Sequence, residues 1–172
     1  MAMNHLLRGK KILVVDDEPD ILETLEEVLD SCCVTTAGDF ESARRLLINE
    51  PFDAAILDIM GVNGYDLLNL AKAKGMPVLM LTAHALSPDH LEKSIRSGAC
   101  CYLPKDEMVN IGEHLLDAFA AEARDGEASH PWFDKLTPYF DKKWGSQWKR
   151  DRMETLRRLN LVHSQKELED IL

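Results

Sequence analysis

The stretch AAILDIMGVNGYDLL, residues 54–68, runs through apolar side chains to a single carboxylate, Asp58, and then breaks at glycine. A short apolar run bounded by turn residues is typical of a strand buried on both faces of a parallel sheet. In such a sheet, ligands bind outside the carboxyl ends of the strands. A lone aspartate there could simply start a turn, so the stretch indicates a functional site only if other charges converge on the same edge.

Short apolar runs alternate with amphipathic stretches through the first 125 residues. The amphipathic stretches are typical of helices, and Ser87 with Pro88 predicts the cap and first residue of one of them. Five strand–helix alternations predict an α/β fold, a doubly wound five-stranded parallel sheet with right-handed crossovers. The runs expected as strands lie in KKILVVD, CCVTTA, DAAILD, PVLMLTA and CCYLP.

The expected strands deliver charged and hydroxyl side chains to one edge of this sheet. The first strand ends in Asp16 and Asp17, the third in Asp58, and the fourth in Thr82, while the fifth reaches Lys105. Carboxylates crowded at one point repel each other and resist ionising together. A divalent cation relieves that repulsion, and an all-oxygen set of ligands suits Mg²⁺.

A lysine beside such a cation site suits an incoming anion, such as a phosphoryl group. A carboxylate can act as the nucleophile and become an aspartyl-phosphate. Catalysis of phosphoryl transfer is then mostly positioning and electrostatic stabilisation. The sequence therefore predicts that Asp58 is phosphorylated, with Mg²⁺ and Lys105 supplying positive charge.

The motifs LVVDDE, ILDIM, LTA and YLPK occur in an order and spacing that resembles the receiver domain of bacterial two-component response regulators. The resemblance covers about residues 10–123. It implies a flavodoxin-like (CheY-like) fold with strand order 2-1-3-4-5. A linker over residues 124–130 and a small helical extension over residues 131–172, without a recognised output fold, are expected to follow.

The resemblance also implies roles for individual residues. Asp58 matches the phosphoacceptor, Asp17 the direct metal ligand, and Asp16 a ligand acting through water. The backbone carbonyl of Met60 would be a further ligand of Mg²⁺. Lys105 matches the catalytic lysine of the family.

Thr82 and Tyr102 match the family's switch pair. The resemblance implies that a phosphoryl oxygen draws in Thr82 and that Tyr102 then turns inward. The phosphoryl donor would be a sensor histidine kinase or a phosphotransfer protein, and the output a contact with a downstream protein or a homodimer. Catalysis would be limited to the protein's own phosphorylation and dephosphorylation.

Two features depart from the usual family pattern. Six steps separate Asp58 from Gly64, where the family usually has eight, so the loop beside the metal is shortened. In Pro104-Lys105-Asp106 the proline precedes the lysine instead of following it.

The last 47 residues differ in composition from the rest. Residues 1–125 hold 22 acids and 11 bases, whereas residues 126–172 hold 8 acids and 9 bases and all three tryptophans. Two or three short helices are expected there, with interruptions at Pro138 and Gly145 and a capping box of Ser164 and Glu167. This segment is too small for an independent domain, so it is expected to pack on the first domain or on a second copy.

Seven bases and two acids between Lys142 and Arg158 leave a second function open. Bases interleaved with aromatic residues would suit nucleic acid, making the protein a transcriptional regulator with a reduced DNA-binding tail. The preferred interpretation is a solvated helix with Trp144 and Trp148 packed inward. A phosphorylation-independent scaffold is a third alternative. A flavin-binding domain is rejected, because the acidic turn DDEPD would repel the cofactor's phosphate.

Cysteine and histidine patterns indicate no metal or redox motif. The cysteines form two adjacent pairs, at 32–33 and 100–101, and are expected as small buried side chains in a reducing compartment. His84, His90 and His114 are expected at the surface. No apolar run approaches a membrane span and the N-terminus lacks a secretory core, so a cytoplasmic protein is expected. The kinase, the target, the lifetime of the phosphate and the oligomeric state stay open.

Overall fold

A computed structural model describes residues 2–124 and 130–162 of the chain. Its centre is a five-stranded parallel sheet with the order β2-β1-β3-β4-β5, which confirms the predicted fold. The winding direction reverses between β1 and β3, and this is where a ligand site is expected. The strands are β1 (Lys11–Val15), β2 (Cys33–Ala37), β3 (Ala54–Asp58), β4 (Val78–Thr82) and β5 (Cys101–Pro104).

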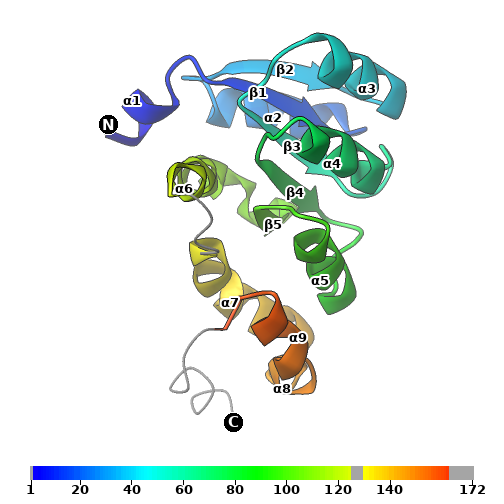
Figure 1. Ribbon diagram of the computed structural model, residues 1–172, viewed down its shortest axis with the longest axis vertical. Coiled ribbons are helices and arrows are strands. Elements are labelled where there is room, and N and C mark those ends of the chain that lie inside the picture. Colours follow the sequence, from blue (N-terminus) through cyan, green and yellow to red (C-terminus); the bar gives the residue numbers. More distant parts are fainter. Residues whose placement is uncertain (1, 125–129, 163–172) are drawn as a thin grey trace.

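Helices cover both faces of the sheet (Figure 1). Three of them follow one another along one face, α3 (Phe40–Asn49), α4 (Gly64–Ala73) and α5 (Pro88–Arg96). Helices α2 (Pro19–Val28) and α6 (Ile111–Ala123) cover the opposite face. A 3-10 helix, η1 (Lys105–Asn110), joins β5 to α6. Every residue of β3, β4 and β5 is buried, as the continuous apolar runs predicted.

The predicted start of α5 is confirmed in detail. The Ser87 hydroxyl accepts a hydrogen bond from the His90 backbone N–H at 3.2 Å, and Pro88 is the first helical residue. A proline at this position loses nothing, because its missing N–H would have no partner inside the helix.

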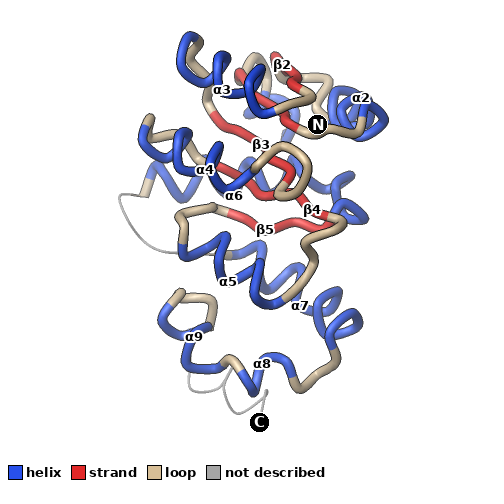
Figure 2. Tube along the Cα trace, turned by 90° about the vertical axis from the view of Figure 1, so that its right-hand side faces the viewer, coloured by secondary structure: helices blue, strands red, loops and turns tan. Residues whose placement is uncertain are grey.

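The extension forms α7 (Pro131–Trp144), α8 (Trp148–Asp151) and α9 (Met153–Arg158), beyond β5 and α5 (Figure 2). The interruption predicted at Gly145 is confirmed, but the one at Pro138 is wrong, because α7 continues through it. Its apolar stripe is buried on both sides of the proline, with Phe133 and Phe140 each at most 3% exposed. This packing outweighs the backbone hydrogen bond that the proline removes.

A short N-terminal helix, α1 (Ala2–Leu7), was not predicted. Six residues carry too little periodicity to announce a helix, and such a helix depends on tertiary contacts. Leu7 supplies them, since it is 3% exposed and α1 packs against α6.

The cysteine prediction is right for only one of the four. Cys101 is 1% exposed, but Cys33 is exposed because it begins the edge strand β2. Cys32 and Cys100 are half-buried, and all four are free thiols.

No helix within residues 2–124 and 130–162 has the length and apolarity needed to cross a membrane. The predicted capping box of Ser164 and Glu167, and most of the predicted linker, lie outside the described residues.

Candidate functional site

Two acids and a lysine meet at the carboxyl edge of the sheet. Asp16 follows β1, Asp58 is the last residue of β3, and Lys105 follows β5. Lys105 Nζ lies 2.8 Å from Asp16 Oδ2 and 3.5 Å from Asp58 Oδ1. Asp16 is 0% exposed, Asp58 is 3% exposed and Lys105 is 7% exposed. Removing charges from water is expensive, so a cluster of this kind in a small protein points to chemistry rather than stability.

Glu18 joins this cluster and was not singled out from the sequence. Its Oε1 accepts a hydrogen bond from Lys105 Nζ at 2.9 Å, and its backbone N–H donates to Asp16 Oδ1 at 2.9 Å. Glu18 therefore holds the lysine from the solvent side, with about half of its own side chain exposed. The signal was the third acid of DDE, which is hard to distinguish from an ordinary helix N-terminal acid.

The pKa of the Asp58 carboxyl is raised to about 7. Burial is the main cause, the negative charge of Asp16 adds to it, and Lys105 opposes both. Burial also raises the pKa of Asp16. Burial acts to lower the pKa of Lys105, but hydrogen bonds to Asp16 and Glu18 outweigh it, so the net shift is upward. The lysine is therefore a fixed cation, while Asp58 is an acid whose charge depends on its neighbours.

An all-oxygen cation site is compatible with this geometry. Carboxylate oxygens of Asp16, Asp17 and Glu18 lie within 4.8 Å of one another. Asp16 Oδ2 is buried, and its near neighbour is the charged Lys105 Nζ at 2.8 Å. Gly61 brings the loop after Met60 against this cluster, since a Cβ on Gly61 would lie 2.6 Å from Asp17 Oδ2. These donors fit the oxygen preference of Mg²⁺.

The shortened loop closes by a close backbone approach. A Cβ on Gly64 would lie 2.0 Å from the Asp58 carbonyl oxygen, so only glycine fits at the start of α4. The Gly64 N–H donates to the Ile59 carbonyl at 3.1 Å, and Asn63 adopts a left-handed conformation with φ 54°. The loop therefore fixes the backbone of the acid itself.

Thr82 and Tyr102 both hydrogen-bond to the backbone of Ala85, one at its N–H and the other at its carbonyl. The Ala85 N–H donates to Thr82 Oγ1 at 2.9 Å, and the Tyr102 hydroxyl donates to the Ala85 carbonyl at 2.6 Å. The same hydroxyl accepts from the Ser87 N–H at 3.0 Å. These bonds link Thr82 and Tyr102 through Ala85. Both side chains are buried, so the Tyr102 ring already lies inside the protein, whereas the resemblance implied that it turns inward only after phosphorylation.

The extension packs on the first domain, which is one of the two predicted alternatives, and the surface it covers, which was not predicted, contains Tyr102. The rings of Tyr102 and Phe140 of α7 lie 6.0 Å apart. Arg152 Nη1 pairs with Asp89 Oδ1 at 2.8 Å and with Glu92 Oε1 at 2.9 Å, both on α5. The extension is thus attached to the sheet and to a helix of the first domain.

The bases and tryptophans of the extension are largely engaged within the protein. Lys149 pairs with Asp141 at 3.4 Å, and Lys135 pairs with Asp117 of α6 at 2.9 Å. Trp144 and Trp148 pack inward as predicted, although the break at Gly145 places them on different helices. Trp144 stacks on Phe140 at 4.6 Å between ring centroids, and Trp148 is 5% exposed.

The histidine prediction fails at one of three positions. His84 is exposed, and His90 is half-buried and hydrogen-bonded to the Tyr65 hydroxyl through Nδ1 at 2.8 Å. His114 is only 3% exposed, because α6 turns it towards the extension. Its burial could not be predicted without knowing that α7 packs on α6.

Known proteins resemble this chain over its first two-thirds. Residues 12–115 match the response regulator receiver domain family. The two-component response regulator ARR12 of Arabidopsis thaliana is 34% identical over 126 residues, which cover 67% of this chain and 21% of that protein. The chain therefore spans about a fifth of the length of this curated relative.

Solved structures give the same result. The response regulator receiver domain protein (CheY-like) from Methanospirillum hungatei has 26% identity and a TM-score of 0.62, covering 69% of this chain and 99% of that one. The receiver domain protein from Clostridium thermocellum has 29% identity and a TM-score of 0.58, covering 66% and 97%. With a plant protein among the relatives, the similarity does not establish the bacterial origin that the resemblance implied.

Proposed function

Because this chain belongs to the response regulator receiver domain family, we propose that it accepts a phosphoryl group on Asp58 in a Mg²⁺-dependent reaction. The donor is a sensor histidine kinase or a phosphotransfer protein, and the reaction takes place in the cytoplasm. One observation carries the proposal: Asp58 ends β3 in a buried site where Lys105 Nζ lies 3.5 Å from its Oδ1. An acid and a cation in this arrangement suit the transfer of an anionic group.

The chemistry follows from the side chains present. A carboxylate oxygen of Asp58 attacks the phosphorus of a phosphohistidine and forms a new O–P bond. The P–N bond breaks, and its electron pair stays on the leaving imidazole. Lys105 lies beside the attacking oxygen, where its charge stabilises the phosphoryl oxygens in the transition state.

The proposed cation ligands are Asp17, Asp16 through water, Asp58 and the Met60 carbonyl. When bound, Mg²⁺ supplies positive charge that offsets the crowded carboxylates and the incoming phosphoryl group. The Asp58 pKa of about 7 shows why such compensation matters, since a protonated carboxyl cannot attack. Lys105 supplies part of that compensation and is itself held by Glu18.

The switch we propose acts through Ala85. The Thr82 side chain rotates so that its hydroxyl donates a hydrogen bond to a phosphoryl oxygen on Asp58. This rotation disturbs the hydrogen bond that Thr82 Oγ1 accepts from the Ala85 N–H. Tyr102 holds the carbonyl of the same residue, so the disturbance reaches its ring and then Phe140 of α7. Phosphorylation thus biases the contact between the receiver and its extension.

The output is a change in protein–protein contact, made by the extension or by the face it covers, towards a downstream protein or a second copy. A DNA-binding tail is not favoured. Lys135, Lys149 and Arg152 are paired with acids, and the aromatic rings that could stack on bases are turned inward.

Intact-mass measurement tests the proposal. The full chain is incubated with acetyl phosphate, with and without Mg²⁺, alongside Asp58→Asn and the control Asp20→Asn, which removes a nearby exposed acid. We expect one added phosphoryl group in the wild type and in Asp20→Asn, and none in Asp58→Asn or without Mg²⁺. Unchanged labelling of Asp58→Asn, or no labelling under conditions that label another receiver domain, would overturn the proposal in favour of a scaffold.

A further inference from the structure

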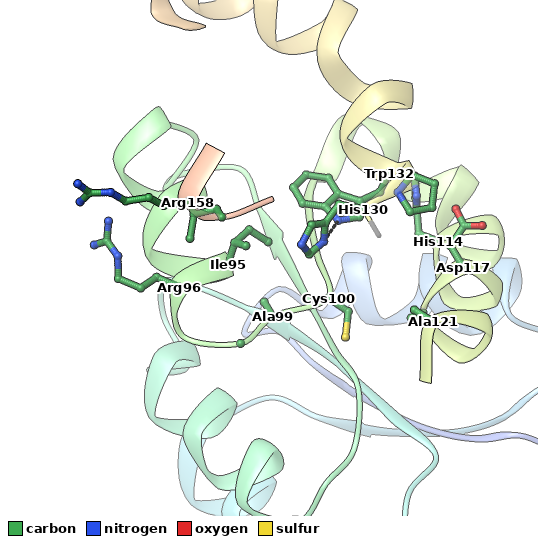
Figure 3. A pocket seen from close by; sticks show the side chains of 14 residues that line it. Ile95, Arg96, Ala99, Cys100, His114, Asp117, Ala121, His130, Trp132 and Arg158 are labelled. Atoms are coloured by element: carbon green, nitrogen blue, oxygen red, sulfur yellow. Dashed lines mark hydrogen bonds between the residues drawn. The ribbon is translucent and has the colours of Figure 1, made fainter. Parts of the chain in front are cut away.

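A pocket of about 400 Å³ lies between the receiver and the extension (Figure 3). The end of α5, the residues before β5, and α6 form one side of it, while the start of α7 and the end of α9 form the other. Its volume falls in the range of small-molecule sites. It shares no residue with the proposed phosphoryl site.

The lining of the pocket is mainly apolar. Ile95 and Ala99 on one side, Ala121 on α6, and Trp132 on α7 form its walls. The Trp132 ring is held in place by a hydrogen bond from its Nε1 to His130 Nδ1 at 3.3 Å. Such walls favour a flat or branched apolar body that can leave water on binding.

Polar groups are few and mostly basic. Arg96 and Arg158 line one end, where Figure 3 shows both side chains extending outward on the same side, and Arg158 Nη2 pairs with Glu154 Oε1 at 2.5 Å. His114 also lines it, is 3% exposed, and its Nδ1 has no hydrogen-bond partner among the described residues. A buried polar atom without a partner is costly, so a water molecule or a polar group of a ligand is expected beside it.

A metal is not the expected occupant. Although histidine, cysteine and aspartate all occur in the lining, the described residues contain no cluster of metal-ligating groups outside Asp16, Asp17 and Glu18. The guanidinium group of Arg96, joined by that of Arg158 when it exchanges Glu154 for a ligand, favours an anion at the rim instead, because arginine binds carboxylates in a forked, charge-assisted geometry.

We propose that this pocket binds a small organic acid with an apolar, preferably aromatic, body and one anionic group. The body lies against Trp132 and the alanines, and the anionic group lies towards Arg96 and Arg158. Since the walls come from both parts of the chain, a bound acid holds the extension on the receiver. The protein then responds to a small molecule in addition to phosphorylation.

The probe for this site is 8-anilinonaphthalene-1-sulfonate, an aromatic monoanion whose fluorescence rises when it leaves water. The full chain is titrated with it, and 1-naphthoate and the neutral 1-naphthamide then compete for the site. We expect saturable binding to one site. Displacement by the naphthamide should be about tenfold weaker than by the naphthoate, because the charge-assisted bonds are lost.

Matched variants locate the binding. The double variant Arg96→Gln with Arg158→Gln should bind the probe with about tenfold lower affinity. Arg44→Gln with Arg157→Gln changes the net charge equally, and both arginines are exposed and outside the pocket, so affinity should stay the same. Ala121→Trp fills the pocket and should abolish binding.

Amide chemical shifts of the wild-type chain provide a second readout that needs no variant to fold. On adding 1-naphthoate, shifts should cluster on Cys100, Ala121, Trp132 and the end of α5. Shifts spread over the surface, equal competition by the neutral amide, or binding that survives Ala121→Trp in a folded variant would each overturn the proposal.

Discussion

At the scale of single residues, the central feature is an acid whose charge is poorly compensated. Asp58 is buried next to Asp16, and Lys105 is shared among three carboxylates. Such an arrangement lowers stability, because the protein keeps a carboxyl group in a place where its charged form is disfavoured, and groups of this kind are found at functional sites.

The stability of the protein should therefore depend on pH through Asp58. Its pKa rises from 3.8 to about 7 on folding, so the folded state holds a proton that the unfolded state has lost. The free energy of unfolding thus falls as pH rises through this window. Without Mg²⁺ at about pH 8, Asp58→Asn should increase the free energy of unfolding by about 1–3 kcal/mol.

Urea denaturation at several pH values measures this effect. The gain should shrink towards about pH 4, where the folded wild type holds the proton and its Asp58 is neutral, as the asparagine is. A gain that is the same at acid and alkaline pH would contradict the assigned cause.

The sequence located these charged residues because parallel strands end at one edge, so their order along the chain predicts their convergence. It did not identify Glu18 as a partner of Lys105, since an exposed acid at a helix start looks the same whether or not a lysine reaches it. It also could not show that Thr82 and Tyr102 share Ala85, because that link depends on how the loop folds.

At the scale of elements, the short connection from β3 to α4 determines how Asp58 is held. A Cβ on Gly64 would lie 2.0 Å from the Asp58 carbonyl oxygen, far inside the sum of the two van der Waals radii, so α4 starts directly against the end of β3. The sequence showed that this loop is two steps shorter than usual, but not where the missing length is recovered.

Gly64→Ala should therefore be strongly destabilising. The added methyl group would lie 2.0 Å from a backbone oxygen, and a shift of strand or helix is needed to relieve it. We expect a loss of about 2–4 kcal/mol in the free energy of unfolding. Gly38→Ala is the matched control, because its nearest contact would be an ordinary 3.9 Å, and it should change stability by less than about 1 kcal/mol. Equal effects of the two substitutions in denaturation experiments would show that the connection is not tight.

The strands and most helices could be predicted because each carries its own periodicity. The two misjudged elements depend on distant contacts. Helix α1 forms against α6, and α7 continues through Pro138 because its aromatic stripe is buried against β5 and the other helices of the extension. Tertiary packing overrides local propensity in both cases.

At the scale of the whole molecule, the extension is attached to the receiver through a mixed apolar and ionic seam. Phe140 contacts Tyr102, Arg152 joins α5, and His114 of α6 is buried where α7 begins. Composition suggested that the extension packs somewhere, but the sequence could not identify the surface. The contacts of Phe140 with Tyr102 and of Arg152 with α5 join residues more than 30 positions apart and have no shared motif.

The seam should loosen in acid because of His114. Burial lowers the pKa of His114 below its usual 6.5, and the charge of Lys135 adds to this, while Asp117 and Glu113 oppose it. Below pH 6.5 His114 therefore binds a proton more readily in the unfolded chain than in the folded one, so the contribution of His114 to the free energy of unfolding falls as pH decreases. His114→Gln removes this contribution, so between about pH 7 and pH 5 the free energy of unfolding of the variant should rise relative to that of the wild type, as measured by denaturation at each pH.

His5→Gln serves as the control, because His5 is exposed on α1. It should leave the pH dependence of the wild type unchanged. If His114→Gln and His5→Gln changed the pH dependence of the free energy of unfolding equally, burial of His114 would not be the cause of that dependence.

We propose that phosphorylation of Asp58 reaches the extension through Thr82, Ala85 and Tyr102. Amide hydrogen exchange tests it in the full chain, treated with acetyl phosphate and Mg²⁺ and checked by intact mass, beside Asp58→Asn treated identically. We predict faster exchange in residues 83–87 and in α7 of the phosphorylated wild type only, with α3 unchanged as an internal reference. A fully phosphorylated chain whose α7 exchanges at the unphosphorylated rate would contradict the claim.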